Sequence, residues 1–502
     1  MLKRLYSSAA AAAATVAATF ATSATSAHPF RVAVVGSGPA GFYAAYRLLE
    51  RLPQASVDIY EALPVPFGLA RFGVAPDHPE VKNCQDKFTE VAETQPTRLR
   101  FVGNTAVGRD VSLPNLVNAY NSVLFAYGAA HEQSLGVPGE QLPGVYSARQ
   151  FVGWYNGLPS QAGLNPPLEN AEVVTVIGNG NVALDVARVL LCDPETRLKA
   201  TDITEEAYEV LKRSRVRHVR VIGRRGLLQS AFTTKEIREL VNEPGVTMLP
   251  LHERYIAPYR ALIPKLGRVQ KRMMQVIEKA SNAYDPTVPA AKTFSLEYLL
   301  SPKEFFPGTT PGLLSATECR INVLQQDDLT APARAVVTNE TVVLPNELVF
   351  KSIGYKAEPL LGMDSLGIAF DEIRGVVPNE LGRVLVKTPH NGKNEASTPS
   401  KSLYVTGWVK TGPTGVIAST MREAFEVADL MVDDVLSGTA NTDIKPGYAG
   451  VVSEIEASTH PVSWAEWKAI DQAEAARGAE IGKPRVKFQS VSDMLDVLGI
   501  KS

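Results

Sequence analysis

The sequence predicts an α/β protein made of two Rossmann-like, three-layer domains, with the second domain inserted into the first. Two stretches, 30–49 and 173–191, each have the order of a buried strand, a glycine-rich turn and an amphipathic helix. A third strand, turn and helix in that order occupies 402–436. Strands that alternate with helices are typical of a parallel sheet covered on both faces. A chain of 502 residues is also long enough for two or three domains.

We therefore expect four segments along the chain. They are a leader at 1–28, the first part of the first domain at 29–131, the second domain at 132–365, and the rest of the first domain with a C-terminal tail at 366–502. The chain leaves the first domain after the apolar run 123–127, which stops at Gly128. The strand 402–406 brings it back, so the first domain is expected to be discontinuous.

The first turn is Gly36-Ser37-Gly38-Pro39-Ala40-Gly41. In this context Gly36 permits the tight turn, Gly38 lets a pyrophosphate approach the backbone, and Gly41 lets helix and strand pack closely. The helix N-terminus then faces the phosphates. The next strand, 57–60, ends at Glu61, whose carboxylate can accept hydrogen bonds from a ribose and repels a 2′-phosphate. The unit predicts a bound dinucleotide, and a glycine turn without a ligand is the alternative.

The second turn, Gly178-Asn179-Gly180-Asn181-Val182-Ala183, has alanine in place of the third glycine. The strand that follows, 218–222, leads to Arg224 and Arg225 where the first unit has an acid. Guanidinium groups make charge-assisted, often bidentate bonds to phosphate oxygens. The contrast with Glu61 predicts FAD in the first site and NADP in the second, unless the two arginines are ordinary surface charges.

Three further segments have features that bear on chemistry. Prolines and glycines are frequent from Pro64 to Pro79, which predicts a long ordered loop. In that loop His78 is either a proton carrier or a hydrogen-bonded loop histidine. The segment Leu262–Ala280 is expected to be a helix that has basic residues at three- and four-residue steps: Lys265, Arg268, Lys271 and Arg272.

This basic stripe has no interleaved acid before Glu278. It is either a solvated helix face or a surface for an acidic partner. Near the end of the chain, the run from Gly407 to Ile417 precedes a helix that is expected to begin at about Gly415. A helix N-terminus at that place can stabilise negative charge on a reduced flavin ring.

The composition is that of a globular protein, with 45% apolar residues, 21% charged residues and a net charge of −2. This balance gives no argument for nucleic acid, and no apolar run has the length of a membrane span. Cys84, Cys192 and Cys319 lie far apart. Without a C-x-x-C pair we expect no disulfide framework, no dithiol centre and no metal site.

Residues 1–28 have Lys3 and Arg4 near their start and continue mainly with alanine, serine and threonine. The first acidic residue of the chain is Glu50. A basic start, a hydroxyl-rich body and missing acids are typical of a mitochondrial presequence. A secretory signal, with small residues at 21–27 as its cleavage region, and a disordered tail are the alternatives. We therefore expect a mitochondrial protein whose leader is removed.

Taken together, the motifs resemble adrenodoxin reductase, the mitochondrial type of ferredoxin–NADP reductase. The resemblance covers nearly the whole chain after the leader and is most specific in the loop Pro66–Pro79 and the run Gly407–Ile417. The other matching stretches are Val34–Gly41, Val57–Glu61, Phe151–Leu158, Gly178–Asp185, Gly223–Gly226, Ser352–Lys356, Gly375–Asn379 and Gly482–Arg485. Two positions depart from the pattern. Thr411 stands where the relatives have arginine, which puts a charge contact there in doubt, and Asn179 conservatively replaces a more usual glutamine.

The resemblance implies the roles of individual residues. For FAD it implies Gly36, Gly38, Ala40, Gly41, Glu61, Leu69, Val107, Trp408 and Gly415, Val416 and Ile417. For NADP(H) it implies Asn179, Gly180, Asn181, Val182, Arg224, Arg225, Glu236 and Gly415. It further implies a catalytic pair, Asp185 and His78, near the flavin, and a surface for an acidic [2Fe–2S] ferredoxin at Arg238, Arg268 and Arg272.

The implied activity is that of a flavoprotein reductase that passes electrons from NADPH through FAD to the ferredoxin. The resemblance leaves open whether they serve cytochrome P450 hydroxylation, haem modification or iron–sulfur assembly. It also leaves open whether the protein lies free in the matrix or touches the inner membrane peripherally. A disulfide reductase, a flavin monooxygenase and a non-catalytic FAD-binding protein are the rival interpretations of the two glycine turns.

Overall fold

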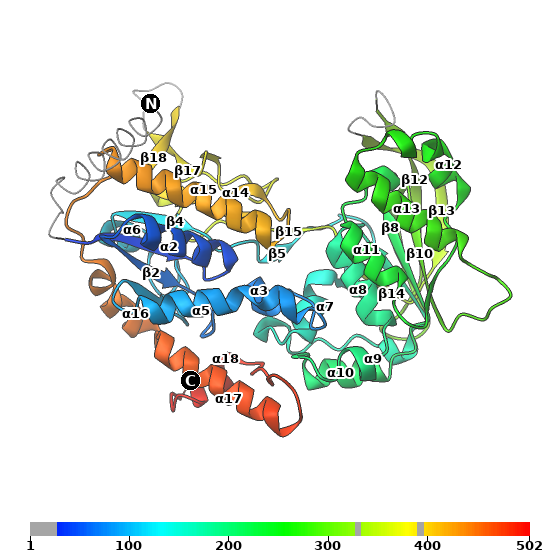
Figure 1. The fold of residues 1–502 in the computed structure, drawn as a ribbon, viewed down its shortest axis with the longest axis horizontal. Coiled ribbons are helices and arrows are strands. Elements are labelled where there is room, and N and C mark those ends of the chain that lie inside the picture. The colour runs from blue at the N-terminus through cyan, green and yellow to red at the C-terminus, as the bar shows by residue number, and fades with distance from the viewer. Residues whose placement is uncertain (1–27, 327–332, 389–395, 502) are drawn as a thin grey trace, which may run out of the picture.

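The computed structural model describes residues 28–326, 333–388 and 396–501. These form two lobes that are connected by a narrow crossing (Figure 1). The predicted leader, apart from His28, lies outside the described residues. No helix in the described ranges has the length and apolarity that crossing a bilayer requires.

The first lobe is built on a seven-stranded sheet in the order β16-β17-β18-β4-β1-β2-β3. The strands are β1 Phe30–Val35, β2 Ala55–Tyr60, β3 Leu99–Val102, β4 Ser122–Phe125, β16 Asn379–Glu380, β17 Arg383–Thr388 and β18 Ala396–Val405. β18, β4, β1, β2 and β3 are parallel, whereas β16 and β17 form an antiparallel edge. Leu403 of β18 pairs with Val123 of β4. The chain therefore returns to its first sheet, which confirms the predicted discontinuous domain.

Both faces of this sheet are buried, as alternation along β1 requires. Phe30, Val32 and Val34 belong to one apolar cluster, and Ala33 and Val35 belong to another. The helices α2 Pro39–Arg51 and α15 Ile417–Leu436 lie side by side (Figure 1). The other helices of this lobe are α3 Leu69–Phe72, α4 Pro79–Lys82, α5 Cys84–Thr94, α6 Leu113–Ala119, α14 Trp408–Thr411, α16 Val452–Ser458, α17 Trp464–Glu480 and α18 Val491–Asp496.

The second lobe contains a six-stranded parallel sheet in the order β6-β14-β7-β8-β10-β9. Its strands are β6 Val145–Ser147, β7 Val173–Ile177, β8 His218–Gly223, β9 Val246–Met248, β10 Lys292–Tyr298 and β14 Leu348–Lys351. The helices are α7 Ala148–Tyr155, α8 Asn181–Leu191, α9 Pro194–Arg197, α10 Glu205–Lys212, α11 Thr234–Val241, α12 Glu253–Arg260 and α13 Arg268–Asn282.

The third layer of this lobe is a sheet and not a set of helices. The antiparallel strands β11 Leu300–Pro307, β12 Leu314–Gln325 and β13 Arg334–Pro345 supply Phe305, Leu314 and Cys319 to a cluster with Ile177 and Ile222 of the parallel sheet. The two lobes meet where β5 His131–Glu132 pairs with β15 Tyr355–Lys356. The segment bounds given above, 29–131, 132–365 and 366–502, stay a prediction.

One helix prediction was wrong. The segment Leu262–Ala280 is not continuous, because a 3₁₀ turn at Ile263–Lys265 is followed by a break, and α13 begins only at Arg268. Pro264 lacks the N–H that a helix interior needs, and Gly267 is extended with ψ 150°. Lys265 is therefore separated from the basic residues of α13.

Candidate functional site

The first glycine turn connects β1 to α2. Gly36 has φ +106°, and an added Cβ would lie 2.6 Å from the carbonyl oxygen of Ala126. At Gly41 an added Cβ would lie 2.1 Å from the carbonyl oxygen of Gly36, so only glycine fits. A Cβ at Gly38 would meet no described atom within 4 Å. The turn thus leaves room directly before the N-terminus of α2, as a bound pyrophosphate requires.

Glu61 follows β2 and faces this turn. Its carboxylate accepts hydrogen bonds from the backbone N–H of Ser37 at 3.1 Å and from the Ser37 hydroxyl at 2.6 Å. Burial raises the pKa of Glu61, although the two bonds from Ser37 oppose the shift. The acid is therefore held at the strand end where a ribose would lie.

Two distant segments lie against the same turn. Gly68, just before Leu69, comes so near that its added Cβ would lie 3.2 Å from the Cα of Gly38. Gly407, just before Trp408, has φ +68°, and its added Cβ would lie 2.6 Å from the Cβ of Ala40. The structure therefore brings Leu69 and Trp408 to the first turn.

The remaining residues expected at FAD lie near these segments. Val107 is buried in the apolar cluster that contains Val35 and Tyr60, against which Trp408 packs. Gly415 has φ +86°, and Val416 and Ile417 stand at the N-terminus of α15. Thr411 makes no charge contact, because its hydroxyl donates to the carbonyl oxygens of Gly407 and Gly412 at 3.3 and 3.0 Å.

The second glycine turn connects β7 to α8 in the same way. Gly178 has φ +124°, and an added Cβ would lie 2.0 Å from the carbonyl oxygen of Ser352, whereas one at Gly180 would meet no described atom within 4 Å. The Asn181 side chain accepts from the backbone N–H of Thr233 at 2.8 Å. The side-chain nitrogen of Asn179 is buried and has no hydrogen-bond partner among the described residues. An orphaned donor beside an open turn fits a bound phosphate or nicotinamide group.

Arg224 and Arg225 follow β8 on the edge of this second site. Arg224 is exposed and Arg225 is half-buried. Their carbonyl oxygens accept from the Asn322 side chain at 2.7 Å and from the Leu299 N–H at 3.2 Å. In the described part of the chain neither guanidinium has an acidic partner. Both are therefore free to bind an anion, which fits a 2′-phosphate.

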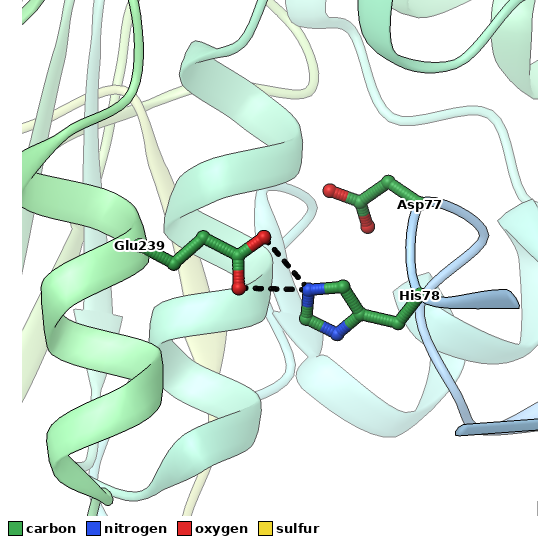
Figure 2. A group of neighbouring side chains, drawn as sticks. All are labelled: Asp77, His78 and Glu239. Carbon is green, nitrogen blue, oxygen red and sulfur yellow. Dashed lines mark hydrogen bonds and ion pairs between the residues drawn. The ribbon is translucent and has the colours of Figure 1, made fainter. Parts of the chain in front are cut away.

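The loop of the first lobe meets α11 of the second lobe at His78. The His78 Nε2 atom lies 2.9 and 2.8 Å from the two carboxylate oxygens of Glu239 (Figure 2). Asp77 stands beside this pair, on the same loop (Figure 2). The His78 side chain is only 9% exposed. The contact therefore forms inside the junction of the two lobes.

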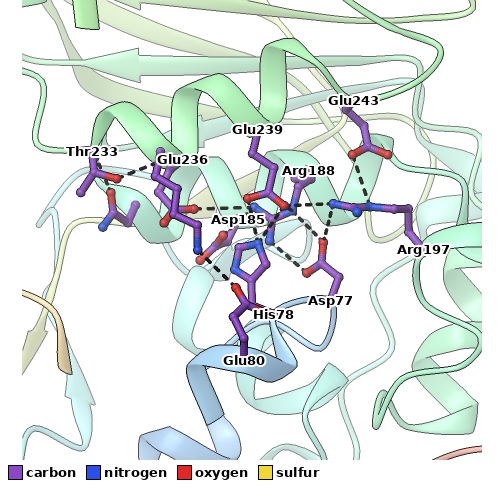
Figure 3. A network of polar contacts seen from close by, with 12 residues as sticks. Asp77, His78, Glu80, Asp185, Arg188, Arg197, Thr233, Glu236, Glu239 and Glu243 are labelled. Atoms are coloured by element: carbon purple, nitrogen blue, oxygen red, sulfur yellow. Dashed lines mark hydrogen bonds and ion pairs between the residues drawn. The ribbon is translucent and has the colours of Figure 1, made fainter. Parts of the chain in front are cut away.

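Two arginines of the second lobe complete the charges at this place (Figure 3). Arg188 of α8 binds Asp77 through Nε and Nη2 at 2.8 and 3.0 Å, and binds Asp185 through Nη1 at 2.8 Å. Arg197 of α9 binds Asp77, Glu239 and Glu243 at 3.2, 3.0 and 3.4 Å. The junction cluster, as we call it, comprises Asp77, His78, Asp185, Arg188, Arg197, Glu236, Glu239 and Glu243.

Carboxylates outnumber guanidiniums in the junction cluster. Burial and the neighbouring charges shift the pKa values of these carboxylates in different directions. Burial alone would raise the pKa of Asp77, but the hydrogen bonds and charge of Arg188 hold it below its usual value. Burial raises the pKa of Asp185 in spite of Arg188 and His78. Burial and the charge of Asp185 also raise the pKa of Glu236. Burial raises the pKa of Glu243 as well, against the charge of Arg197. Of these acids with a raised pKa, Asp185 and Glu236 are the two that lie beside His78.

The predicted pair His78 and Asp185 is brought together, with Glu236 beside it. Ligand atoms of these three residues lie within 4.8 Å of one another, and the same holds for Asp77, His78 and Glu239. Such a spacing would suit a cation. The carboxylates of Asp77 and Glu239 are, however, already bound by Arg188 and Arg197.

Three basic residues expected at a partner surface lie on two helices that pack against each other, α11 and α13. Arg268 and Arg272 of α13 are exposed, and Arg238 of α11 is half-buried. Within the described ranges none of the three side chains has an acidic partner. Val269, between the two exposed arginines, is 75% exposed.

Sequence reasoning missed several members of the junction cluster: Asp77, Arg188, Arg197, Glu239 and Glu243. A signal existed for two of them. Arg188 stands three residues after Asp185 in α8, and Glu239 stands three residues after Glu236 in α11, so each shares a helix face with a predicted residue. The cross-lobe partner of Arg188, Asp77, had no such local signal.

Comparisons with known proteins agree with this geometry. The sequence family described as pyridine nucleotide-disulphide oxidoreductase matches residues 30–250. The NADPH:adrenodoxin oxidoreductase of Homo sapiens mitochondria is 43% identical over 483 residues, covering 93% of this chain and 92% of the relative. The corresponding Arabidopsis thaliana protein is 38% identical, with coverages of 94% and 95%. The structure of Mycobacterium tuberculosis FprA in complex with NADPH has a TM-score of 0.81 at 35% identity, covering 94% of this chain and 99% of FprA.

Two glycine turns, each between a parallel strand and a helix and each in its own lobe, define a pyridine-nucleotide oxidoreductase with two nucleotide-binding domains. The similarity to the mitochondrial relatives extends over more than nine-tenths of the chain and therefore identifies one family within this class. The chain belongs to the family of mitochondrial NADPH:adrenodoxin oxidoreductases.

Proposed function

We propose that the protein is an FAD-containing reductase that carries electrons from NADPH to an acidic, adrenodoxin-like [2Fe–2S] ferredoxin. The observation that carries the proposal is the opposite chemistry of the two turn edges. Glu61 closes the first turn with an acid, whereas Arg224 and Arg225 leave two free guanidiniums at the second. An acid at this position repels a 2′-phosphate, so the first site suits FAD. A pair of arginines at the corresponding position binds a 2′-phosphate, so the second site suits NADP.

The first site would hold FAD. The open face of Gly38 and the N-terminus of α2 receive the pyrophosphate, Glu61 binds the ribose, and Leu69, Val107 and Trp408 supply apolar contacts. The N-terminus of α15, at Gly415, Val416 and Ile417, offers its N–H groups and positive dipole end to the flavin ring. FAD, when bound, supplies the conversion between two-electron and one-electron transfer.

The second site would hold NADPH. Asn179, Gly180, Asn181 and Val182 border the open turn, and Arg224 and Arg225 bind the 2′-phosphate. Glu236 has a buried carboxylate oxygen without a hydrogen-bond partner among the described residues. Such an acceptor fits an amide donor such as that of the nicotinamide. Gly415 would contribute from the first lobe.

The junction cluster would control protons and orientation. The hydrogen bond between the His78 Nε2 atom and the Glu239 carboxylate holds the imidazole in one orientation. The raised pKa of Asp185 makes it a proton acceptor within reach of His78. Arg188 fixes Asp185 and Asp77 in place, and the closely packed junction excludes water from the reacting groups.

The ferredoxin would dock on Arg238, Arg268 and Arg272. These residues are unpaired within the described ranges, and the exposed Val269 adds an apolar point among them. Charges of this kind steer an acidic partner and fix its orientation more than they add affinity. The protein works in mitochondria, as its relatives do, and we place it in the matrix, with a peripheral contact to the inner membrane left to experiment.

A disulfide reductase is the second candidate, because the matching family description includes that chemistry. All three cysteines are free: Cys84 is half-buried on α5, and Cys192 and Cys319 are buried far from each other in sequence. They form no dithiol for a disulfide substrate. Incubating the purified holoenzyme with NADPH and either a [2Fe–2S] ferredoxin or a disulfide separates the two candidates. We expect ferredoxin reduction, and turnover with the disulfide alone would overturn the proposal.

A further inference from the structure

The C-terminal tail crosses from the first lobe to the second. After α17 the chain passes beside α10 (Figure 1). There the Nζ atom of Lys487 lies 2.8 Å from the Oδ2 atom of Asp202, in the segment between α9 and α10. Lys82, the last residue of α4, binds the same carboxylate at 2.6 and 2.8 Å. Asp202 of the second lobe is thus held by two ammonium groups that belong to the first lobe and its tail.

The tail is firmly attached on the first lobe. Glu474 of α17 accepts two hydrogen bonds of 2.6 Å from Arg71 of α3, and the two side chains are 0% and 2% exposed. The N–H of Val486 donates to the Glu474 carbonyl oxygen at 2.9 Å. A buried ion pair of this kind holds its two elements in one arrangement, because breaking it leaves an uncompensated charge.

The tail also contacts the second lobe next to Asp202. The Nζ atom of Lys483 donates to the carbonyl oxygen of Ile203 at 3.1 Å, and the same ammonium pairs with Glu205 at the start of α10. Lys483 and Lys487 are both buried. Two lysines of one short segment therefore bind three groups within residues 202–205: the carboxylate of Asp202, the carbonyl oxygen of Ile203 and the carboxylate of Glu205.

The charge arrangement at Asp202 is redundant. Burial would raise the pKa of Asp202, but Lys487 and Lys82 hold it well below the usual value. Burial, together with the charges of Lys82 and Arg71, lowers the pKa of Lys487 to about 7, against the attraction of Asp202. Both pKa values are lowered, which favours an ionised Asp202 but a neutral Lys487. Asp202 stays ionised because two ammonium groups, those of Lys82 and Lys487, face its one carboxylate. A single protonated lysine is sufficient to balance it.

This tail joint, Lys82 with Asp202 and Lys487, shares its elements with the junction cluster. Lys82 ends α4, which begins directly after His78. Asp202 follows α9, whose last residue is Arg197. A shift of the tail joint would therefore move His78 and Arg197 relative to each other.

We propose that Lys82, Asp202 and Lys487 are positioning residues that fix the second lobe against the first, so that bound NADPH meets the flavin in a reactive geometry. This rests on the proposed function. Either lysine alone holds Asp202, so the lobes keep their arrangement when one is lost and lose it when both are lost. Misplacement by about 1 Å lowers a transfer rate by roughly a hundredfold, so the reaction is sensitive to such a joint.

The test compares Lys82→Met, Lys487→Met, the double variant Lys82→Met/Lys487→Met and Asp202→Asn in the FAD-loaded protein. We measure the rate constant of flavin reduction by saturating NADPH, the rate of reduction by dithionite, and the radius of gyration by small-angle X-ray scattering. Glu195→Gln is the matched control, because Glu195 pairs with Lys199 and Lys212 inside the second lobe only.

For each single lysine variant, we expect the rate constant of flavin reduction by NADPH to stay within about threefold of the parent value. In the double variant and in Asp202→Asn, the rate constant of flavin reduction by NADPH should fall by roughly tenfold or more. Their radius of gyration should increase, and the rate of reduction by dithionite should stay unchanged. A double variant whose rate equals the product of two small single effects, with unchanged scattering, overturns the proposal. A parent protein that NADPH does not reduce would instead contradict the proposed function. If Asp202→Asn fails to fold, the lysine double variant decides alone. The variant Lys82→Met/Lys487→Arg, which has a positive charge at position 487 again, should then recover the rate that Lys82→Met/Lys487→Met loses.

Discussion

At the scale of single residues, the proposed assignment of FAD to one site and NADPH to the other rests on which charged residue follows a strand end. Glu61 after β2 and Arg224 after β8 occupy corresponding positions in two similar units, yet they carry opposite charge. The sequence was sufficient to predict this contrast, because strand, turn and charged residue follow one another within a short segment. The contacts of Arg188 were not predictable in this way, since Asp77 belongs to the other lobe.

The first prediction concerns selectivity for NADPH. Replacing Arg224 and Arg225 by alanine should raise the KM for NADPH by more than roughly tenfold, because charge-assisted hydrogen bonds contribute about 1.5–3 kcal/mol each. The KM for NADH should hardly change. Steady-state reduction of ferricyanide with each cofactor measures this, and Arg217→Ala, before the other end of β8, is the control. Equal losses with NADPH and NADH would mean that the arginines do not read the 2′-phosphate.

The second prediction concerns Arg188, which is 0% exposed. Arg188→Met should destabilise the protein by about 3–5 kcal/mol, because Asp77 is left as a buried charge without its main partner and the half-buried Asp185 loses its ion pair. Arg197→Met, whose parent side chain is 33% exposed, should have a smaller effect. Denaturant unfolding of the three proteins gives the comparison, and equal stabilities of the two variants would contradict this account.

The pH dependence of that difference follows from the sign of the Asp77 shift. Its pKa lies below the usual value, so the pairing contributes stability at neutral pH that is lost as pH falls through the folded-state pKa. In Arg188→Met the carboxylates should protonate more readily. The stability gap between parent and variant should therefore narrow as the pH falls below about 4. A gap that stays constant from neutral to acidic pH would argue against charge as its cause.

At the scale of helices and strands, the sequence predicted regular elements well where the pattern was local. The strands around both glycine turns and the helix up to Leu436 agree with the structure. Pro264 and Gly267 are both unfavourable inside a helix and indicate the break before α13. The helical spacing of the basic residues nevertheless predicted one continuous helix. The antiparallel sheet β11-β12-β13 was not predicted, because it covers a face on which this fold class usually has helices.

The third prediction tests the basic surface of α13. Reversing Arg268 and Arg272 to glutamate should slow ferredoxin reduction strongly at low salt and less at high salt, because exposed charges act over a screening length of about 8–10 Å. Reduction of ferricyanide should be unaffected, since it needs no docking. Lys279→Glu, at the far end of the same helix, serves as the control. If both acceptors lose rate together, α13 has a structural role, and if neither does, it is a solvated face.

At the scale of the whole molecule, the first site is assembled from both ends of the chain. The strand β18 joins the sheet beside β4, and the turn after it places Gly407 against Ala40. The sequence predicted this return from the strand–turn–helix order at 402–436. It did not predict that the tail continues to the second lobe, because the buried contacts of Lys483 and Lys487 join segments without any shared motif.

The fourth prediction concerns this return. Gly407→Ala should lower the FAD content of the purified protein, because the new Cβ would lie 2.6 Å from that of Ala40 and displace the turn that we propose to hold FAD. Gly412→Ala is the matched control, since it has a similar φ of +81° but no described atom within 4 Å of an added Cβ. The ratio of flavin to protein absorbance measures the content. Equal losses in the two variants would attribute the effect to backbone strain and not to the contact with the first turn.

The central claim is that this chain converts the two electrons of NADPH into single electrons for a [2Fe–2S] ferredoxin. The most direct test is an anaerobic titration of the FAD-loaded protein and an acidic, adrenodoxin-type ferredoxin with NADPH, followed through the visible absorbance of the iron–sulfur cluster. We expect about two ferredoxins to be reduced for each NADPH, with NADH far slower and the rate falling as salt rises. A flavin that NADPH reduces while the ferredoxin stays oxidised at low salt would contradict the claim.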